Sequence, residues 1–442
     1  MTATLLLLLS APQSGPTSWW QTYGDPELTR IVEKVASSNL DLRSAAARIA
    51  ESRAAAGERR SALGPSINFT TGAQRLRGGF AQGIARIPQN PGDAQSGAFV
   101  SPFETGLIQG QLDMRWELDL FGTNRASLAA ARADASAEQE LRNDVLIAVT
   151  AEAARNYLEL RGIEERLAIA RESLATQKDL LGLTEDRARA GLASQLDVER
   201  QAVLVANTES AIPGLEAERS VRLHRIAVLT GDFGFAVQPG SNPLNLPRTQ
   251  SAAVTADVLK RRPDVRAAET RILAAAARLK QARSDRYPKI ALSGLAGRQG
   301  TSVSGLSFGG GNFFSIGPQL QLPIFNYGRI RSNIDASDAR LERERAAFES
   351  EVLSALEEAN NALANYRRQQ EREAALANAE RAAQTSLDLS ADLNKAGLSD
   401  FLAVLDAQRS LLDARDQRSA ARTQSLVQSV ALYKALAGGW PQ

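Results

Sequence analysis

The chain has 442 residues and a formal net charge of +2, with 23% of its residues charged. This balance excludes a protein that binds nucleic acid through a basic surface, because phosphate contacts need a clustered excess of Lys and Arg. The sequence contains no cysteine and one histidine, His224. Disulfides, thiolate metal sites and the usual histidine routes to zinc or general-base chemistry are therefore excluded.

The N-terminal residues 1–18 hold an apolar core, Leu5–Leu9, followed by small residues. This pattern resembles the end of a secretory signal, and a disordered start is the alternative. No run of about 18 apolar residues occurs, which excludes a transmembrane helix. Residues 25–27, Asp-Pro-Glu, predict a helix start, and a second helix is expected over 41–63, before Gly64-Pro65.

Two strands follow, separated by an expected long loop over 77–104 that is rich in Gly, Pro, Gln and Asn. The first strand is expected over 65–75. The second, over 106–122, alternates strictly between apolar and polar residues, which predicts one apolar and one polar face. Its apolar positions are Ile108, Gly110, Leu112, Met114, Trp116, Leu118 and Leu120, and its polar positions are Gln109, Gln111, Asp113, Arg115, Glu117 and Asp119.

An Ala-rich, proline-free helix is then expected from Asn124 to about Ala190, roughly 65 residues and about 95 Å long. Residues 190–194 break it, because Gly191 is a natural C-cap and Ser194 a natural N-cap. A return helix is expected over 195–229, kinked or split at Pro213-Gly214.

The proline-rich segment 230–255 predicts a linker, after which the pattern starts again. A helix is expected over 257–286, a strand over 289–298, a Gly/Ser loop over 299–312 and a strand over 314–324. A second very long helix is expected over 330–395, with a break at Gly397 and a last helix over 401–436. Residues 261–264, Arg-Arg-Pro-Asp, are interpreted as a structural motif in which Asp264 caps the helix that begins there.

The two halves can be superposed in sequence, which indicates a duplicated unit. Each unit reads helix, strand, strand, long helix, turn, return helix. The matching stretches are Pro65-Ser66-Ile67 with Pro288-Lys289-Ile290, Leu118 and Phe121 with Leu322 and Phe325, Ala190-Gly191-Leu192 with Ala396-Gly397-Leu398, Leu196 with Leu402, and Leu229-Thr230-Gly231 with Leu436-Ala437-Gly438.

One chain therefore supplies about four strands, whereas a membrane barrel must close and needs about eight or more. The symmetric solution is a ring of identical subunits, continued by the long helices as a cylinder with a polar lumen. Asp113, Arg115, Glu117 and Asp119 are expected to face that lumen. Trp116 is either an interfacial aromatic or a helix-packing residue. The expected function is a conduit without bond-making chemistry, cofactor or metal.

The chain resembles the outer-membrane efflux family, the channel proteins of tripartite pumps in Gram-negative bacteria, and within it the multidrug, metal or nodulation-type efflux lipoproteins. The motifs that carry the resemblance are WELDLFG at 116–122, RRPD at 261–264, LPIF at 322–325, LDAQRS at 405–410 and the C-terminal YKAL and GGW at 433–440. The branch usually carries a lipid-modified N-terminal cysteine, for which this sequence has no counterpart.

The resemblance implies a homotrimer, with a barrel of about twelve strands in the outer membrane and a long α-helical barrel in the periplasm. The implied partners are a periplasmic adaptor protein, an inner-membrane pump reached through it, and outer-membrane lipid. The implied segments are 19–64, N-terminal equatorial and helical; 65–122, first β-barrel hairpin; 123–230, first helical hairpin; 231–256, equatorial linker; 257–287, helix of the second repeat; 288–325, second β-barrel hairpin; and 326–442, second helical hairpin with the C-terminal equatorial segment.

The two breaks between long helices should be free tips, and by resemblance they dock the adaptor. The alternative is ordinary helix capping. The residues assigned to docking are Arg187, Gly191, Leu192, Ser194, Lys395, Gly397, Leu398 and Ser399.

Leu402, Asp406 and Arg409 share one helix face at spacings of four and three, and the family's constriction maps onto them. In the repeat, Leu196 matches Leu402 and Arg200 matches Asp406. We therefore hypothesise that Arg200 and Asp406 alternate around the lumen of a trimer and hold it closed. The alternative is a solvated helix face with chance complementarity.

Two other classes of protein are alternatives to a channel. A soluble coiled-coil scaffold would bury the apolar strand faces within compact heads. An enzyme would need a nucleophile–base pair, a phosphate loop or a metal cluster, and the sequence offers none of these patterns.

Overall fold

A computed structural model describes residues 19–82, 99–238, 240, 244–247, 260–303 and 306–437. The expected signal segment, the middle of the first long loop, much of the linker and the C-terminal GGW motif lie outside these residues. The chain divides into a helical unit (Met1–Ile49, Ser136–Glu269 and Ala346–Gln442) and a sheet unit (Ala50–Ala135 and Thr270–Arg345).

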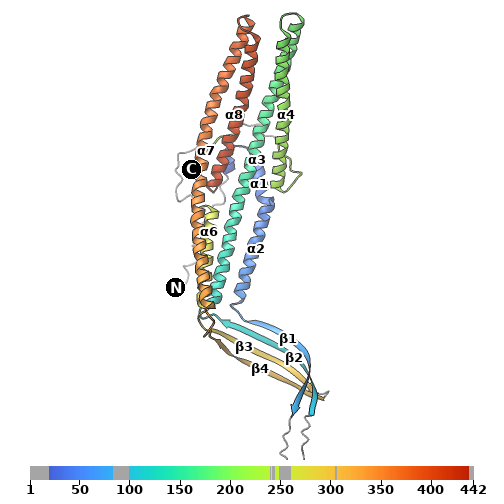
Figure 1. Ribbon diagram of the computed structural model, residues 1–442, viewed down its shortest axis with the longest axis vertical. Coiled ribbons are helices and arrows are strands. Elements are labelled where there is room, and N and C mark those ends of the chain that lie inside the picture. Colours follow the sequence, from blue (N-terminus) through green and yellow to red (C-terminus); the bar gives the residue numbers. More distant parts are fainter. Residues whose placement is uncertain are drawn as a thin grey trace, which may run out of the picture. The chain divides into compact units, whose positions relative to one another are not determined.

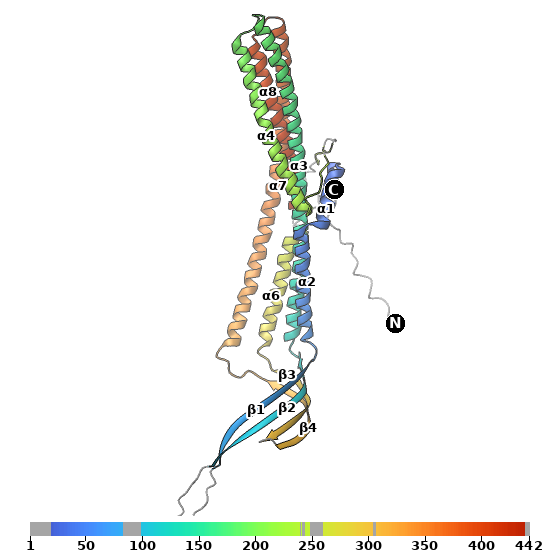
Figure 2. The ribbon, with the colours of Figure 1, turned by 90° about the vertical axis from the view of Figure 1, so that its right-hand side faces the viewer.

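The helices have the lengths that a duplicated unit requires. Helices α2 (Leu40–Ser61) and α6 (Pro263–Ser284) have 22 residues each, and α3 (Thr123–Arg189) and α7 (Arg329–Lys395) have 67 each. The return helices α4 (Gln195–Thr230) and α8 (Phe401–Ala435) have 36 and 35 residues. Within the helical unit, α3–α4 and α7–α8 form two hairpins whose turns lie at the same end (Figures 1 and 2).

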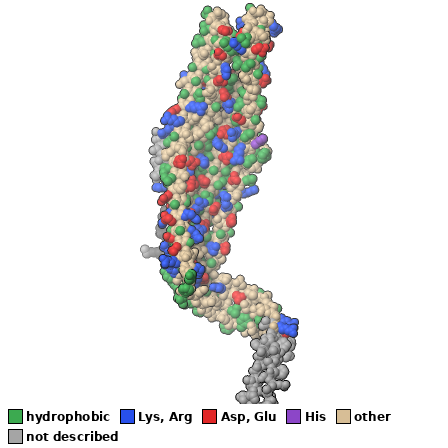
Figure 3. Space-filling model, viewed as in Figure 1, with side chains coloured by type: hydrophobic (Ala, Val, Ile, Leu, Met, Phe, Trp, Pro, Cys, Tyr) green, Lys and Arg blue, Asp and Glu red, His purple; other side chains and the backbone are tan. Residues whose placement is uncertain are grey.

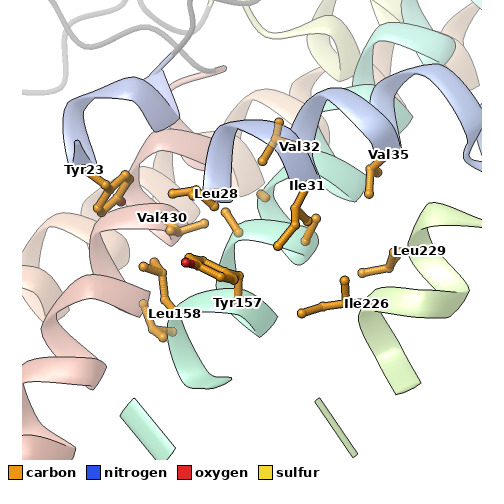
Figure 4. Close-up of a cluster of buried hydrophobic side chains, with 14 of the residues drawn as sticks. Tyr23, Leu28, Ile31, Val32, Val35, Tyr157, Leu158, Ile226, Leu229 and Val430 are labelled. Atoms are coloured by element: carbon orange, nitrogen blue, oxygen red, sulfur yellow. The ribbon is translucent and has the colours of Figure 1, made fainter. Parts of the chain in front are cut away.

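The core of the helical unit is built around α1 (Pro26–Ser38). Asp25 caps this helix by accepting the backbone N–H groups of Glu27 and Leu28, and Pro26 fits its first turn. Its apolar face meets residues of α3, α4 and α8, as Figure 4 shows. Trp19, in the short 3-10 helix Trp19–Tyr23, is buried and stacks on Tyr433, with ring centroids 5.2 Å apart.

Helix α4 is continuous through Pro213, so of the two predicted outcomes the split is wrong and the kink stays a prediction. Pro213 and Gly214 are both exposed. Because proline has no backbone N–H, one carbonyl of the preceding turn lacks a hydrogen-bond donor. Water can hydrate this carbonyl at the exposed site, and the helix continues.

The sheet unit contains an antiparallel sheet in the order β1-β2-β3-β4 (Figure 1). The strands are β1 (Ser66–Gln82), β2 (Phe99–Leu118), β3 (Lys289–Val303) and β4 (Leu306–Gln321). The loops predicted over 77–104 and 299–312 are therefore too long. Strand ladders are made by backbone groups, so pairing continues through Gly- and Gln-rich residues in which side-chain alternation is weak.

The predicted continuation of the second strand to Leu120 is also wrong, because β2 ends at Leu118. The Asp119 carboxylate accepts the backbone N–H groups of Asn124 (3.1 Å) and Arg125 (2.8 Å). Asp119 therefore satisfies the exposed donors at the start of α3 and does not belong to the polar strand face. Trp116 donates from Nε1 to the carbonyl of Leu63 at 3.0 Å, which is compatible with both roles expected for it.

Candidate functional site

The register of the sheet places most of the large apolar residues of the four strands on one face, with Leu295 and Phe313 on the other. Ile67 lies opposite Met114, Met114 opposite Gly294, and Gly294 opposite Ile316. On this face the large side chains are exposed in the single chain: Ile67, Phe69, Ile108, Leu112, Phe314, Ile316 and Leu320. An apolar face of this extent indicates contact with lipid or with another protein.

The opposite face of the sheet is polar. Asp113 accepts hydrogen bonds from Thr70 (2.9 Å) and Gln111 (3.0 Å), and Arg115 and Glu117 share its face by alternation. On the side of the molecule shown in Figure 3, acidic and basic side chains are intermixed over the helices, whereas the sheet carries few charges. The sheet thus has the two-sided character of a strand layer between an apolar and an aqueous medium.

The outer strands of the sheet have free edges. Among the described residues, β1 pairs with β2 alone and β4 with β3 alone. Strands of 17 and 16 residues thus leave long rows of unpaired backbone donors and acceptors, which bind another strand readily.

The tip of the first hairpin ends α3 in a Schellman motif. Gly191 adopts a left-handed φ of 75°, its N–H donates to the Ala188 carbonyl (3.0 Å), and the Leu192 N–H donates to the Arg187 carbonyl (2.8 Å). Ser194 then starts α4 with a capping box, in which it exchanges hydrogen bonds with Asp197.

The tip of the second hairpin repeats this geometry. Gly397 has φ 73°, its N–H donates to Asn394, and the Leu398 N–H donates to Leu393. Asp400 caps α8 through the Leu402 N–H at 3.3 Å. Sequence-predicted capping is confirmed at both tips, which present the same backbone shape.

Most of the proposed docking residues are exposed, and two of them are strongly apolar. Arg187, Gly191, Ser194, Lys395 and Gly397 are exposed, and Ser399 is half-buried. Leu192 and Leu398 are 72% and 76% exposed. Each tip therefore presents one leucine at its apex, beside polar groups.

The proposed constriction residues lie within the first three turns of α4 and α8. Asp406 and Arg409 are exposed on α8, Leu402 is half-buried, and Leu196 and Arg200 are exposed on α4. Arg200 lies 4.0 Å from Asp197 of its own helix, and among the described residues no ion pair joins it to Asp406. Within one chain, Arg200 and Asp406 are thus not brought together.

Sequence reasoning missed an acidic cavity in the helical unit. The cavity, of about 240 Å³, is lined by four carboxylates from three helices, Asp144, Asp264, Glu351 and Glu358, together with Arg262 and Lys434. Arg262 contacts Asp264 (2.6 Å) and Glu358 (2.7 Å) and donates to the Ala435 carbonyl (2.9 Å). The RRPD motif was the available signal. Asp264 does not lie at the predicted cap position but inside the first turn of α6, where it accepts the N–H of Val265 (2.8 Å) and pairs with Arg262.

The two pairs of carboxylates in this cavity differ in their pKa. Burial and then the charge of Asp264 raise the pKa of Asp144 and of Glu351. Burial also opposes ionisation of Asp264 and Glu358, but hydrogen bonds and charge from Arg262 outweigh it and hold their pKa values below the usual range. Among the described residues, no group of acidic or histidine side chains is arranged to hold a metal ion.

Among the described residues, none of the helices has a stretch long and apolar enough to cross a membrane. His224, exposed on α4, has the ring of Phe233 6.4 Å away.

The family model described as "Outer membrane efflux protein" matches residues 31–232 and 254–438. The chain is 32% identical over 436 residues to the pyoverdine export outer membrane protein OpmQ of Pseudomonas aeruginosa, covering 96% of this chain and 87% of the relative. Its structure is similar to that of the outer-membrane channel OprN, with a TM-score of 0.79, 32% identity and coverage of 96% and 92%. The fold also matches CusC, with a TM-score of 0.82 at 24% identity over 98% of this chain and 96% of that one.

Proposed function

This chain belongs to the outer membrane efflux protein family, and from that membership we propose that three copies form a passive duct across the outer membrane and into the periplasm. Members of the family are efflux channels of Gram-negative bacteria that work in tripartite pumps, and they are transport proteins. In the proposed assembly, three four-stranded sheets close into one barrel, and the six helical hairpins continue it. The soluble scaffold receives no support from the relatives.

The observation that carries this proposal is the sheet with one exposed apolar face and two free edges. A strand edge cannot remain unpaired in hydrocarbon, because each unsatisfied backbone group costs several kcal/mol. β1 and β4 run in opposite directions, so β4 of one copy can pair with β1 of the next in the antiparallel sense. Repeating that step around a three-fold axis gives a closed, even-numbered barrel with the apolar face outward.

The test is to purify the full chain in mild detergent, measure its mass by light scattering, and add it to planar lipid bilayers. We expect a trimer and discrete conductance steps. A protein that remains monomeric, or that never conducts, would contradict the proposal.

We further propose that the two tips bind the periplasmic adaptor. Their shared Schellman geometry would present Leu192 and Leu398 to small apolar pockets, and Arg187 and Lys395 to polar groups. Replacing Leu192 or Leu398 by Asp should weaken adaptor binding at least tenfold in a pull-down or interferometry titration. Val221→Asp, at an exposed apolar residue farther along α4, is the matched control and should bind normally once its trimer is verified.

The proposed gate is a ring in which Arg200 of one hairpin faces Asp406 of another, with Leu196 and Leu402 about one turn closer to the tips and Arg409 about one turn farther from them. Each exposed pair is worth about 0–1 kcal/mol, so three acting together favour closure by up to about 3 kcal/mol. Arg200→Asp or Asp406→Arg alone should increase open probability in bilayers, and the double exchange should restore closure. Lys178→Ala, at another exposed residue of the first hairpin, should change nothing.

A further inference from the structure

An aromatic pair joins the two copies of the repeat where β2 ends and β3 begins. β2 pairs with β3 so that Trp116 lies opposite Leu292 and Leu118 opposite Ile290. Just beyond these strand ends, Phe121 stacks on Tyr287 with ring centroids 4.8 Å apart and planes 11° apart. The junction inside one chain is thus a strand ladder closed at its base by stacked rings.

The internal repeat assigns an equivalent to each residue of this junction. Leu118 and Phe121 correspond to Leu322 and Phe325, which follow β4. Pro288-Lys289-Ile290 corresponds to Pro65-Ser66-Ile67, so Tyr287 corresponds to Gly64. The equivalent junction would join β4 to β1, and these strands are unpaired with each other within one chain.

The two sides of this second junction are complementary in size. Phe325 is 84% exposed and Tyr327 is 93% exposed, an unusual state for large rings in one segment. On the other side of the junction, Gly64 stands where the first junction has the ring of Tyr287. A Cβ atom added there would meet nothing closer than the Ser61 carbonyl at 3.8 Å, and its backbone does not adopt the left-handed conformation that favours glycine. The backbone conformation therefore does not require glycine at position 64, and the missing side chain leaves open space there.

We propose that Phe325 of one copy packs over Gly64 of a second copy and that β4 pairs with β1 of that copy with Leu320 opposite Phe69. This inference rests on the ring assembly proposed above and specifies its seam. Transferring the β2–β3 register also places Ile316 opposite Ala73 and Gln321 opposite Asn68. The apolar face then continues from one subunit to the next.

Alternation along the strands makes this register selective. A slip of one residue would set the apolar residues of β4 against the polar face of β1, so it is excluded in a barrel with one apolar surface. Slips of two residues keep the faces but move Phe325 away from Gly64. The ring-over-glycine contact therefore selects one register among those that alternation allows.

The natural absence of cysteine permits a direct test by disulfide formation in the full chain. Gln321→Cys combined with Asn68→Cys places two thiols opposite each other on the polar face. We expect covalent dimers and trimers on non-reducing gels after mild oxidation. The pairs Gln321→Cys with Thr70→Cys, and Gln319→Cys with Asn68→Cys, test the two-residue slips and should crosslink at least fivefold less.

Two controls separate the seam from general reactivity. Each single variant should give little crosslinked product. Glu117→Cys with Ala291→Cys, the equivalent pair inside one chain, should form a disulfide without any increase in apparent mass.

A steric exchange tests the ring contact independently. Gly64→Phe should reduce trimer yield several-fold, and adding Phe325→Gly should restore it. Gly57→Phe, on the preceding helix α2 at a position with nothing within 4 Å, should leave the yield unchanged.

The outcomes distinguish this inference from the proposed function. If the wild-type protein is trimeric and conducts but crosslinks best through a slipped pair, or if Gly64→Phe assembles normally, the seam is wrong and the duct stands. If no trimer forms at all, both fail.

Discussion

In each copy of the repeat, the residue before the short helix donates a side-chain hydrogen bond to a carbonyl near the end of the return helix, and we call this contact the joint. The two joints lie at equivalent positions but use different side chains. In the first copy, Asn39 precedes α2 and donates from Nδ2 to the carbonyl of Leu229 at 2.9 Å. In the second, Arg262 precedes α6 and donates from Nη1 to the carbonyl of Ala435 at 2.9 Å. Counted from the equivalent tips Gly191 and Gly397, Leu229 corresponds to Ala435, one residue before the Leu436 with which the sequence matched it. A neutral amide and a guanidinium therefore make the same joint.

The surroundings of the two joints differ in charge. Lys434 and Glu351 of the second copy correspond to Val228 and Val145 of the first. The side chain of Arg262 is only 10% exposed and carries a full positive charge. The carboxylates of Asp264 and Glu358 must therefore compensate this charge. The comparison teaches that the two copies share the geometry of this contact but differ in the charge around it.

Removing the guanidinium should have the largest effect. Arg262→Met leaves Asp264 and Glu358 without their cation in a partly buried site, which should cost about 3–5 kcal/mol. Thermal unfolding of the detergent-solubilised protein, followed by circular dichroism, should show a clear fall in Tm. Arg261→Met, at the exposed neighbour, is the control and should shift stability by about 0.5 kcal/mol or less. Equal effects of the two variants would contradict the assigned role.

The neutral joint should be weaker. Asn39 also accepts the N–H groups of Asp41 (2.9 Å) and Leu42 (3.2 Å) at the start of α2. Asn39→Ala should therefore cost about 1–2 kcal/mol, measured in the same way. Asn39→Asp retains the cap but loses the donor to Leu229, so it should fall between alanine and wild type. A loss as large as that of Arg262→Met would remove the distinction between the joints.

The charged joint should respond to pH. Burial, with the charge of Asp264, raises the pKa of Asp144, so the folded state binds this proton more readily than the unfolded state. Ionisation at neutral pH then costs stability, which is regained as pH falls from neutral toward the ordinary carboxyl range. Asp144→Asn should raise Tm at pH 7.5, and this advantage should shrink as pH falls and disappear near the ordinary carboxyl range, at about pH 4.

Asp413→Asn, at an exposed position on α8, provides the control for this titration and should follow the wild-type pH profile. An advantage of Asp144→Asn that grows on acidification would reverse the predicted sign.

The smallest effect is expected from converting one second-copy residue to its first-copy counterpart. Lys434 contacts Glu358 at 3.2 Å, but the two side chains are 46% and 39% exposed. Lys434→Val should therefore change stability by only about 0–1 kcal/mol. A loss comparable to that of Arg262→Met in the same thermal scan would show that the cluster depends on both cations.

Patterns among residues close together in the sequence were sufficient to predict much of the fold. Alternation predicted the apolar and polar strand faces, and Gly191, Ser194 and Gly397 predicted the caps at both tips, because each cap is satisfied within one turn of helix. Strand lengths were underestimated because backbone pairing continues where side chains alternate weakly. Asp119 was assigned to the strand because its partners lie beyond the turn.

The sequence alone therefore determined the duplication, the long hairpins, the two-faced strands and the shape of the tips, since all of these depend on periodicity and local hydrogen bonding. Only the tertiary structure decided that Arg262 joins α6, α7 and the end of α8, and that Asp144 lies in the same cavity as Glu351. These residues are far apart in the chain. Their energies depend on burial and on distances between charges, which arise when the helices pack.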